Sequence, residues 1–278
     1  MTTELISLAG KVALVTGAGG GIGRSIAENF ASLGAQVALV DRHAGRLAET
    51  AAAFEAKGWD PLLIEADVRE AGSAASTMES IEKRFGRLDI LVNNAGSTLG
   101  LMKPFEKMTD EDFDALYSVL LKHVFVYSRE AIPLIRRSGS GSIIHVSSIE
   151  GYRGLPHLAP YAAFKLALEG FTKSLALELG KDRIRVNTIA PETTESHSIR
   201  PSEWVASENQ ERVEDWIPLG RFGRPEDTAG CAVFLATALS GWVSGTTIHC
   251  DGGALAAAGW YRTREGIWTN TPLIKGSG

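Results

Sequence analysis

The chain has 278 residues, of which 44% are hydrophobic and 22% are charged, and its formal net charge is −5. A chain of this size buries a sizeable core without disulfides or metals, and its acidic balance argues against a general binder of nucleic acid or of anionic membranes. Its two cysteines give no disulfide framework, no window is apolar enough to span a bilayer, and the first residues carry no targeting signal, so a cytoplasmic protein is expected.

Short apolar runs alternate with helical periodicity along the chain. Strands are predicted over residues 11–16, 36–40, 62–66, 88–92, 142–147, 184–189 and 246–250. Helices are predicted over residues 21–34, 46–57, 73–85, 109–137, 159–179 and 225–237. Because right-handed helical crossovers place successive strands in parallel, we predict an α/β fold. It is a single-domain, Rossmann-type, doubly wound fold in residues 1–258, with a seven-stranded parallel sheet and helices on both faces.

Two segments interrupt this alternation. Residues 192–216 are polar and irregular but contain Trp204 and Trp216, and the tail at 259–278 contains Trp260 and Trp268. Large apolar rings on irregular segments commonly cover a pocket or a neighbouring subunit. We therefore predict a lid at about 192–216 and a tail that packs on the fold or on a neighbouring subunit.

Glycines cluster where the first predicted strand ends, in the stretch TGAGGGIG at residues 16–23. Glycines let the backbone approach a pyrophosphate closely, and the following helix offers free N–H groups and the positive end of its dipole. A plain glycine turn is the alternative. The position between a strand and a helix, in the first βαβ unit, favours a dinucleotide site.

Asp41 closes the second predicted strand. A carboxylate at this place accepts hydrogen bonds from the ribose hydroxyls of NAD and repels the 2′-phosphate of NADP. Arg42 follows directly and could pair with that phosphate, whereas Gly20 gives the loop no basic side chain. NAD is therefore predicted as the cofactor, with NADP as the less favoured alternative.

Tyr161 and Lys165 are four residues apart on a predicted helix, so their side chains share one face. A phenol with a pKa of about 10 is a poor base at neutral pH, but the charges of a neighbouring ammonium and of oxidised nicotinamide lower that pKa. We predict Tyr161 as the general acid/base for an alcohol proton and Lys165 as the group that lowers its pKa. Ser147, at the end of a buried strand, is predicted to orient the substrate oxygen.

The motifs occur together in an order known from one family. They are TGAGGGIG, Asp41, Asp67-Val68, Asn93-Asn94-Ala95-Gly96, Ser147, Tyr161-x-x-x-Lys165 and Asp251-Gly252-Gly253. Over about residues 8–253 the chain resembles the short-chain dehydrogenase/reductase family, in its branch of FabG-like 3-ketoacyl reductases and secondary alcohol dehydrogenases.

The resemblance implies a role for each motif in binding the cofactor. The pyrophosphate would be held by Gly17, Gly21, Ile22 and Gly23, the adenine would be flanked by Asp67 and Val68, and the cofactor ribose and the sheet would be supported by Asn93, Ala95 and Gly96. Lys165 would bond the nicotinamide ribose, and the loop after Pro191 would contact the carboxamide through Thr194 and Ser196. Members commonly form homodimers or homotetramers through the long helices, so one of these assemblies is expected.

Two positions depart from the family pattern. Many members carry an asparagine on the long helix that holds a water linking the catalytic lysine to solvent, whereas this chain has Leu120, which can neither donate nor accept. Backbone carbonyls or His123 could replace this relay; alternatively, His123 is a packing or subunit-interface residue. Unchanged turnover and an unchanged pH profile in His123→Ala would exclude the histidine relay. Glu192 stands where the family usually has glycine, so the lid is expected to follow a different path.

Candidates for substrate contact are Glu150 and His157, between the strand of Ser147 and Tyr161, and Trp204 in the lid. Solvated loop residues are the alternative for the first two. His145 is interpreted as a core histidine, and the histidines and cysteines show no ligand spacing for a metal. The partner is expected to be a small molecule, not a nucleic acid or a membrane.

The leading interpretation is an NAD-dependent oxidoreductase that interconverts a secondary alcohol and a ketone, on an apolar or cyclic small molecule. One alternative is an NAD-binding regulator or scaffold without turnover, which only Leu120 supports. Another is a dehydratase or epimerase of the same fold, with which NADH would not accumulate. The presence of Ser147, Tyr161 and Lys165 favours the oxidoreductase, because a binding protein needs no base beside its ligand.

Overall fold

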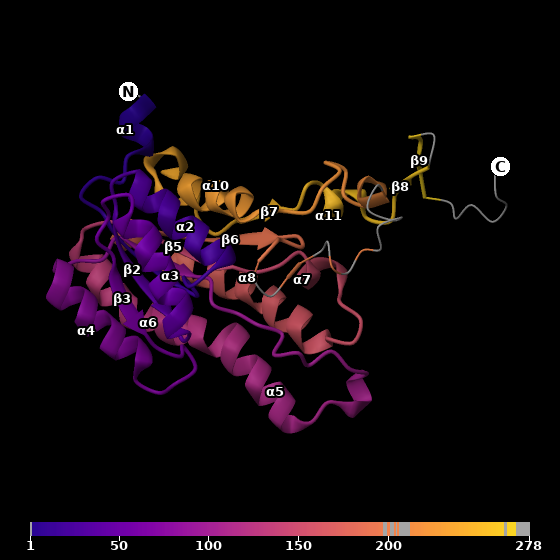
Figure 1. Cartoon of the computed structure of the whole chain (residues 1–278), viewed down its shortest axis with the longest axis horizontal. Coiled ribbons are helices and arrows are strands. Elements are labelled where there is room, and N and C mark those ends of the chain that lie inside the picture. Colours follow the sequence, from indigo (N-terminus) through magenta and orange to yellow (C-terminus); the bar gives the residue numbers. More distant parts are fainter. Residues whose placement is uncertain are drawn as a thin grey trace.

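The computed structural model describes residues 2–196, 199–200, 203, 205, 212–263 and 266–270. Its main sheet has seven parallel strands in the order β3-β2-β1-β4-β5-β6-β7, and β8 and β9 form a separate pair (Figure 1). The main strands are β1 (Val12–Thr16), β2 (Gln36–Asp41), β3 (Leu62–Glu65), β4 (Ile90–Asn93), β5 (Gly141–Val146), β6 (Ile184–Pro191) and β7 (Thr247–Cys250). The predicted doubly wound, seven-stranded fold is thus confirmed.

Helices cover both faces of the sheet. They are α1 (Thr2–Ile6), α2 (Gly21–Ser32), α3 (Ala44–Glu55), α4 (Ser73–Phe85), α5 (Asp110–Tyr117), α6 (His123–Arg137), α7 (Glu150–Arg153), α8 (Ala159–Leu179), α10 (Pro225–Ala236) and α11 (Ala254–Ala257). Buried side chains of α2, α3 and α10 pack on one face, and those of α4, α6 and α8 pack on the other. None of the described helices is long and apolar enough to cross a bilayer.

Both faces of the central strand are apolar, which fixes it in the middle of the molecule. In β1, Ala13 and Val15 belong to the core under α2 and α10, while Val12 and Leu14 belong to the core under α4 and α6. Successive side chains of a strand point to opposite faces, so a continuous apolar run needs cover on both sides. Each fully buried valine or leucine contributes about 1.5–3 kcal/mol relative to exposure.

The predicted helix at 109–137 is continuous but not uniform. Thr109 caps its start, because its hydroxyl accepts the Asp112 N–H (3.3 Å) while the Asp112 carboxylate accepts the Thr109 N–H (2.8 Å). Ser118–Lys122 then forms a π-helical turn between α5 and α6. Such turns add one residue to a helical turn and are frequent at functional sites. Apolar periodicity did not reveal this turn, which contains Leu120.

Residues near the end of the chain contact the segment just after the predicted lid. The N–H of Leu219 donates to the Gly252 carbonyl (3.1 Å), and Arg262 donates to the Pro218 carbonyl (3.3 Å). Arg262 lies in β8 (Tyr261–Arg262), which pairs with β9 (Trp268–Thr269) at the end of the molecule away from α1 (Figure 1). The described part of the tail therefore contacts Pro218, while packing of the whole tail on the fold or on a neighbouring subunit stays a prediction.

Candidate active site

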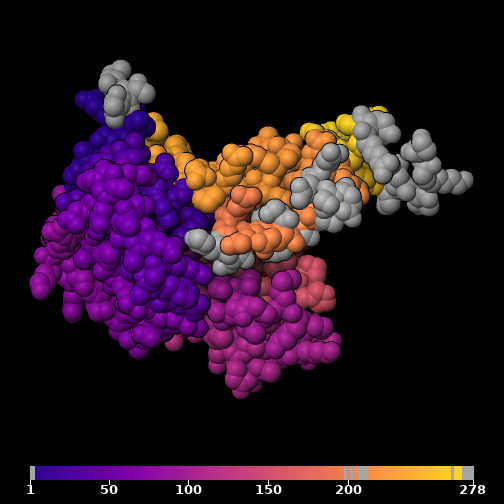
Figure 2. Space-filling view, in the orientation of Figure 1, coloured from indigo at the N-terminus to yellow at the C-terminus, as the bar shows by residue number. Residues whose placement is uncertain are grey.

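A cavity of about 560 Å³ runs along the edge of the sheet where the parallel strands end. This is the usual location of ligand sites in doubly wound sheets, and its volume suits a small-molecule site. The segment after β6 lies beside it, between the indigo-to-purple first part of the chain and the magenta part (Figure 2). Predicted site residues that line the cavity are Gly17, Gly21, Ile22, Gly23, Asp41, Arg42, Asp67, Val68, Ala95, Gly96, Ser147, Glu150, Tyr161, Lys165, Pro191, Thr194 and Ser196.

The glycine loop between β1 and α2 forms a cradle with no room for side chains. A Cβ built on Gly23 would lie 2.2 Å from the Gly17 carbonyl oxygen and 2.5 Å from Asn94 Nδ2. Gly17 (φ 69°) and Gly21 (φ 52°) adopt the left-handed backbone that glycine tolerates without strain. The start of α2 is thereby left open to close approach by a pyrophosphate, so the residues present fit a dinucleotide.

Asp41 ends β2 at the rim of the cavity. Its Oδ2 accepts a hydrogen bond from the Gly19 N–H (2.9 Å), and its Oδ1 accepts one from the His43 N–H (3.0 Å). A Cβ on Gly19 would lie 2.8 Å from Asp41 Cγ, so a side chain there would displace the carboxylate. Each carboxylate oxygen keeps a lone pair for a further donor, such as a ribose hydroxyl.

Basic side chains gather beside Asp41, and sequence reasoning found only Arg42 among them. His43, Arg46 and Arg69 also line the cavity. Arg69 Nε donates to Asp67 Oδ1 (2.9 Å), and Arg42 Nη1 lies 3.9 Å from Asp67 Oδ2. The hydrogen bond from Arg69 holds the pKa of Asp67 below its usual range. The Asp-Val-Arg sequence could have signalled this pair, because Arg69 is two residues from Asp67.

Of two adjacent asparagines, Asn94 rather than Asn93 is among the described residues that line the cavity. Asn93 is 1% exposed, and its Nδ2 lies 3.2 Å from both Ser128 Oγ and His145 Nδ1. Asn94 Nδ2 donates to the carbonyl oxygens of Thr16 (2.9 Å) and Gly17 (3.2 Å). Asn93 therefore bonds within the core and is not among the described residues that line the cavity, so its support of the cofactor ribose and the sheet stays a prediction. Asn94 ties the end of β4 to the glycine loop.

Tyr161 and Lys165 line the cavity from α8. Lys165 Nζ lies 5.7 Å from the centre of the Tyr161 ring and donates to the Val146 carbonyl (2.8 Å). Burial lowers the pKa of Lys165 to about 8. Burial raises the pKa of Tyr161; a hydrogen bond with Ser148 opposes this rise, and the charge of Glu150 adds to it. In the protein without cofactor the pKa of Tyr161 is thus raised, mainly by burial, and its lowering by Lys165 together with oxidised nicotinamide stays a prediction.

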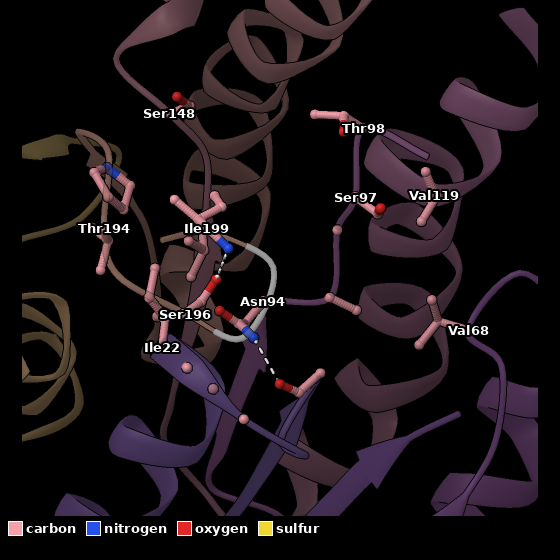
Figure 3. A pocket seen from close by; sticks show the side chains of 18 of the residues that line it. Ile22, Val68, Asn94, Ser97, Thr98, Val119, Ser148, Thr194, Ser196 and Ile199 are labelled. Carbon is pink, nitrogen blue, oxygen red and sulfur yellow. Dashed lines mark hydrogen bonds between the residues drawn. The ribbon is translucent and has the colours of Figure 1, made fainter. Parts of the chain in front are cut away.

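Two serines follow β5, and the structure assigns them different partners. Ser147 Oγ donates to the carbonyl oxygen of Lys165 (2.7 Å). Ser148 forms the hydrogen bond with Tyr161, and Figure 3 shows it at the cavity. The proton of Ser147 is committed to the backbone, so the expectation that Ser147 donates to a substrate oxygen does not hold. Sequence reasoning missed Ser148, because two identical neighbours at a strand end carry no signal of which one faces the reacting group.

Leu120 forms an apolar wall beside the lysine. A Cβ built on Gly96 would lie 3.8 Å from Leu120 Cδ2 and 3.7 Å from Lys165 Nζ. His123 is 1% exposed, and neither ring nitrogen has a hydrogen-bond partner among the described residues. Burial, followed by the charge of Lys165, lowers the pKa of His123 to about 4, so the ring is neutral at neutral pH. Its burial within the subunit excludes the interface alternative; the relay and packing alternatives stay open.

The described residues that follow β6 lie against the glycine loop. Figure 3 shows Thr194, Ser196 and Ile199 beside Ile22. Ser196 Cβ would lie 3.0 Å from a Cβ built on Gly21. The Ile199 N–H donates to Ser196 Oγ (3.1 Å). These contacts cover the part of the cavity next to the glycine loop, where the pyrophosphate is expected.

The residues predicted to contact the substrate differ in their position relative to the cavity. Glu150 lines the cavity, and so does Glu192, which was predicted only as a departure in the lid path. His157 is exposed, has a φ of 64° and is not among the described residues that line the cavity. Trp204 lies outside the described residues.

Comparison with known proteins agrees with this geometry. Residues 17–254 match the family model described as Enoyl-(Acyl carrier protein) reductase. The chain is 37% identical over 254 residues to a Thermotoga maritima protein named an uncharacterized oxidoreductase, an alignment covering 89% of this chain and 98% of that protein. It is 39% identical over 246 residues to a Staphylococcus aureus 3-oxoacyl-(acyl-carrier-protein) reductase, covering 87% of this chain and 97% of that one.

Solved structures give the same result. A short-chain type dehydrogenase/reductase from Mycobacterium marinum has a TM-score of 0.84 at 32% identity, covering 91% of this chain and 99% of that chain. A dehydrogenase/reductase from Sinorhizobium meliloti has a TM-score of 0.83 at 35% identity, covering 91% of this chain and 98% of that chain. The chain therefore belongs to the short-chain dehydrogenase/reductase family of oxidoreductases.

Proposed function

We propose that the protein is an NAD-dependent oxidoreductase that interconverts a secondary alcohol and a ketone. The observation that carries the proposal is the placement of Ser148, Tyr161 and Lys165 on one cavity, beside a glycine cradle shaped for a dinucleotide. A general acid/base beside a cofactor site is needed for catalysis, whereas a protein that only binds the cofactor does not need one.

Each of these side chains has a defined task in that reaction. The nicotinamide cofactor, when bound, accepts or donates the hydride at the substrate carbon. Tyr161 takes the alcohol proton during oxidation and returns it to the ketone oxygen during reduction. Ser148 donates a hydrogen bond that orients the substrate oxygen. The Lys165 ammonium, 5.7 Å from the tyrosine ring centre, stabilises the phenolate and offsets part of its burial cost.

Apolar side chains on the cavity wall support an apolar or cyclic small-molecule substrate. Met102, Val119, Leu155 and Ile199 all line the cavity. Such a lining favours a substrate with a hydrocarbon body, since the transfer of apolar surface from water is favourable. The few polar groups then fix the position of the reacting oxygen.

The position of Asp41 supports NAD over NADP. Its carboxylate is held at the rim by two backbone N–H groups, so it cannot easily turn away from a bound ribose. Two like charges about 4 Å apart near a protein surface repel by about 4 kcal/mol, which disfavours a 2′-phosphate there. Arg42 and Arg69 on the same rim are already paired with Asp67.

The test is a turnover screen of secondary alcohols and ketones, with NAD(H) and NADP(H) in parallel and nicotinamide absorbance as the signal. Turnover of at least one substrate, with the higher kcat/KM on NAD(H), is expected. Cofactor binding without turnover on any compound would favour a regulator. Conversion of substrate without a net change in NADH would indicate dehydration or epimerisation.

The variant Asp41→Ala tests the cofactor assignment. It removes the repelling charge and frees the N–H groups of Gly19 and His43 to bind a phosphate. The ratio of kcat/KM for NAD to that for NADP is expected to fall at least about tenfold, which corresponds to about 1.4 kcal/mol. Asp60→Ala is the control, because Asp60 is 83% exposed and pairs with Arg84 away from the cavity. An unchanged ratio in Asp41→Ala would refute the role of this carboxylate.

A further inference from the structure

One arginine joins the helix that follows β5 to the first residue of the lid. Arg153, the last residue of α7, donates from Nη2 to Glu150 Oε1 (2.7 Å) and to Glu192 Oε1 (3.0 Å). Its Nη1 lies 2.8 Å from Glu192 Oε2. Glu150 and Glu192 both line the cavity, so this arginine connects two of its walls.

Glu192 is the buried member of this cluster. Its side chain is 3% exposed, compared with 18% for Glu150 and 34% for Arg153. A carboxylate buried to this degree is strongly unfavourable unless a cation and hydrogen bonds compensate it. The Arg153 guanidinium supplies that compensation through one charge-assisted hydrogen bond to Oε1 and a close ion-pair contact with Oε2, which has no hydrogen-bond partner among the described residues. The conformation at Glu192 is therefore tied to the position of Arg153.

The same residue also fixes the backbone that follows it. Glu192 Oε1 accepts the Thr193 N–H (2.6 Å) and the Thr193 hydroxyl (2.9 Å). The Glu192 carbonyl accepts the Thr194 hydroxyl (2.8 Å), and the Glu192 N–H donates to the Cys250 carbonyl (3.1 Å). Ser196, two residues after Thr194, lies against Gly21 of the glycine loop. A glycine at position 192 could make none of the side-chain contacts.

We propose that Arg153 and Glu192 are positioning residues, whose ion pair holds residues 193–196 over the cofactor and sets the distance between the lid and the Glu150 wall. The inference rests on the proposed function, because it assigns the cofactor to this cavity. Neither residue takes part in proton or hydride transfer. Without the ion pair, residues 193–196 are held less firmly. Cofactor binding is then weaker, and the KM for substrate rises by a larger factor than kcat falls.

The test uses the full chain with Arg153→Gln, Glu192→Gln, the double variant and Arg153→Lys. The Kd for NADH is measured by nicotinamide fluorescence, and KM, kcat and Tm are measured on the same samples. Each glutamine variant is expected to raise the Kd about tenfold, with the larger effect in Arg153→Gln, which leaves the Glu192 carboxylate buried and uncompensated. The double variant should be no worse than Arg153→Gln alone, because the two residues act as one unit. Arg153→Lys should recover part of the affinity, since a lysine keeps the charge but not the planar guanidinium that reaches both glutamates.

The matched control is Arg136→Gln. Arg136 is 49% exposed, pairs with Asp182 at 2.7 Å and is not among the described residues lining the cavity. Its Kd and KM should equal those of the wild type. A fall in Tm with unchanged Kd and KM in the Arg153 and Glu192 variants would show a merely structural pair and overturn the proposal. If Arg153→Gln does not fold, the Kd and KM of Glu192→Gln and Arg153→Lys test the proposal instead. A wild type that binds neither NADH nor NADPH would instead refute the proposed function.

Discussion

Tyr161→Phe is expected to lower kcat by about 10²- to 10⁴-fold while leaving the Kd for NADH within about twofold of the wild type. The range is that of a general acid/base whose proton transfer is removed. Phenylalanine keeps the ring and loses the hydroxyl bonded to Ser148, so the cavity shape is retained. The measurement is steady-state turnover of a substrate from the screen, with NADH titration on the same samples.

The pH profile gives this prediction a second readout. Burial raises the pKa of Tyr161, so in the protein without cofactor its phenol stays neutral to high pH. Alcohol oxidation needs the phenolate as the base, so its rate should increase as pH rises. Tyr161→Phe should lose that acceleration. Tyr117→Phe is the control, because Tyr117 lies on α5 and is 36% exposed. Equal turnover in Tyr161→Phe and the wild type would remove Tyr161 from the mechanism.

Lys165→Met is expected to lower kcat at least about 100-fold and yet to unfold at the same or a higher temperature than the wild type at neutral pH. The loss arises because no ammonium then stabilises the phenolate. The gain arises because burial lowers the pKa of Lys165 to about 8, which means that folding disfavours its charged form. Methionine has similar length without that charge, although it leaves the Val146 carbonyl without its donor.

The free energy of unfolding of the wild type, relative to that of Lys165→Met, should increase with pH. Between pH 8 and 10.5 the folded wild type holds Lys165 neutral while the unfolded chain keeps it protonated, so the free energy of unfolding rises with pH through this window. A shift from 10.5 to about 8 corresponds to about 3 kcal/mol. Lys165→Met lacks this gain, whereas the control Lys107→Met, which changes an exposed lysine and keeps Lys165, should show the pH dependence of the wild type. Parallel pH dependence of unfolding in wild type and Lys165→Met would contradict the prediction.

The fold could be predicted because its signals are local. The apolar runs of β1 and β5 and the helical spacing of α8 each depend on a few neighbouring residues and on burial on one or both faces. The glycine loop and Asp41 could be placed for the same reason, since a strand, a turn and a helix follow one another there. The order of the strands then follows from the handedness of the crossovers.

The details of the site depend on contacts between distant residues, which a single sequence does not contain. The π turn around Leu120 leaves the apolar periodicity of its helix intact, so nothing in the spacing distinguishes it. Ser147 and Ser148 are chemically identical, and only the packing of α8 on β5 decides which one meets Tyr161. The pair of Arg153 and Glu192 joins positions 39 residues apart, and neither position is unusual by itself.

The anchoring of the lid by the last part of the chain has a consequence for biosynthesis. The carbonyls of Cys250 and Gly252 accept hydrogen bonds from Glu192 and Leu219, at either end of the predicted lid, and Arg262 bonds to Pro218. A nascent chain that has emerged only as far as α8 has the strands β1 to β5 and the helices α2, α3, α4 and α6, but neither α10 nor these anchors. The contacts that hold residues 192 and 218–219 in place therefore form last. They have to wait for the synthesis of about the last hundred residues, which proceeds at about 5–20 residues per second.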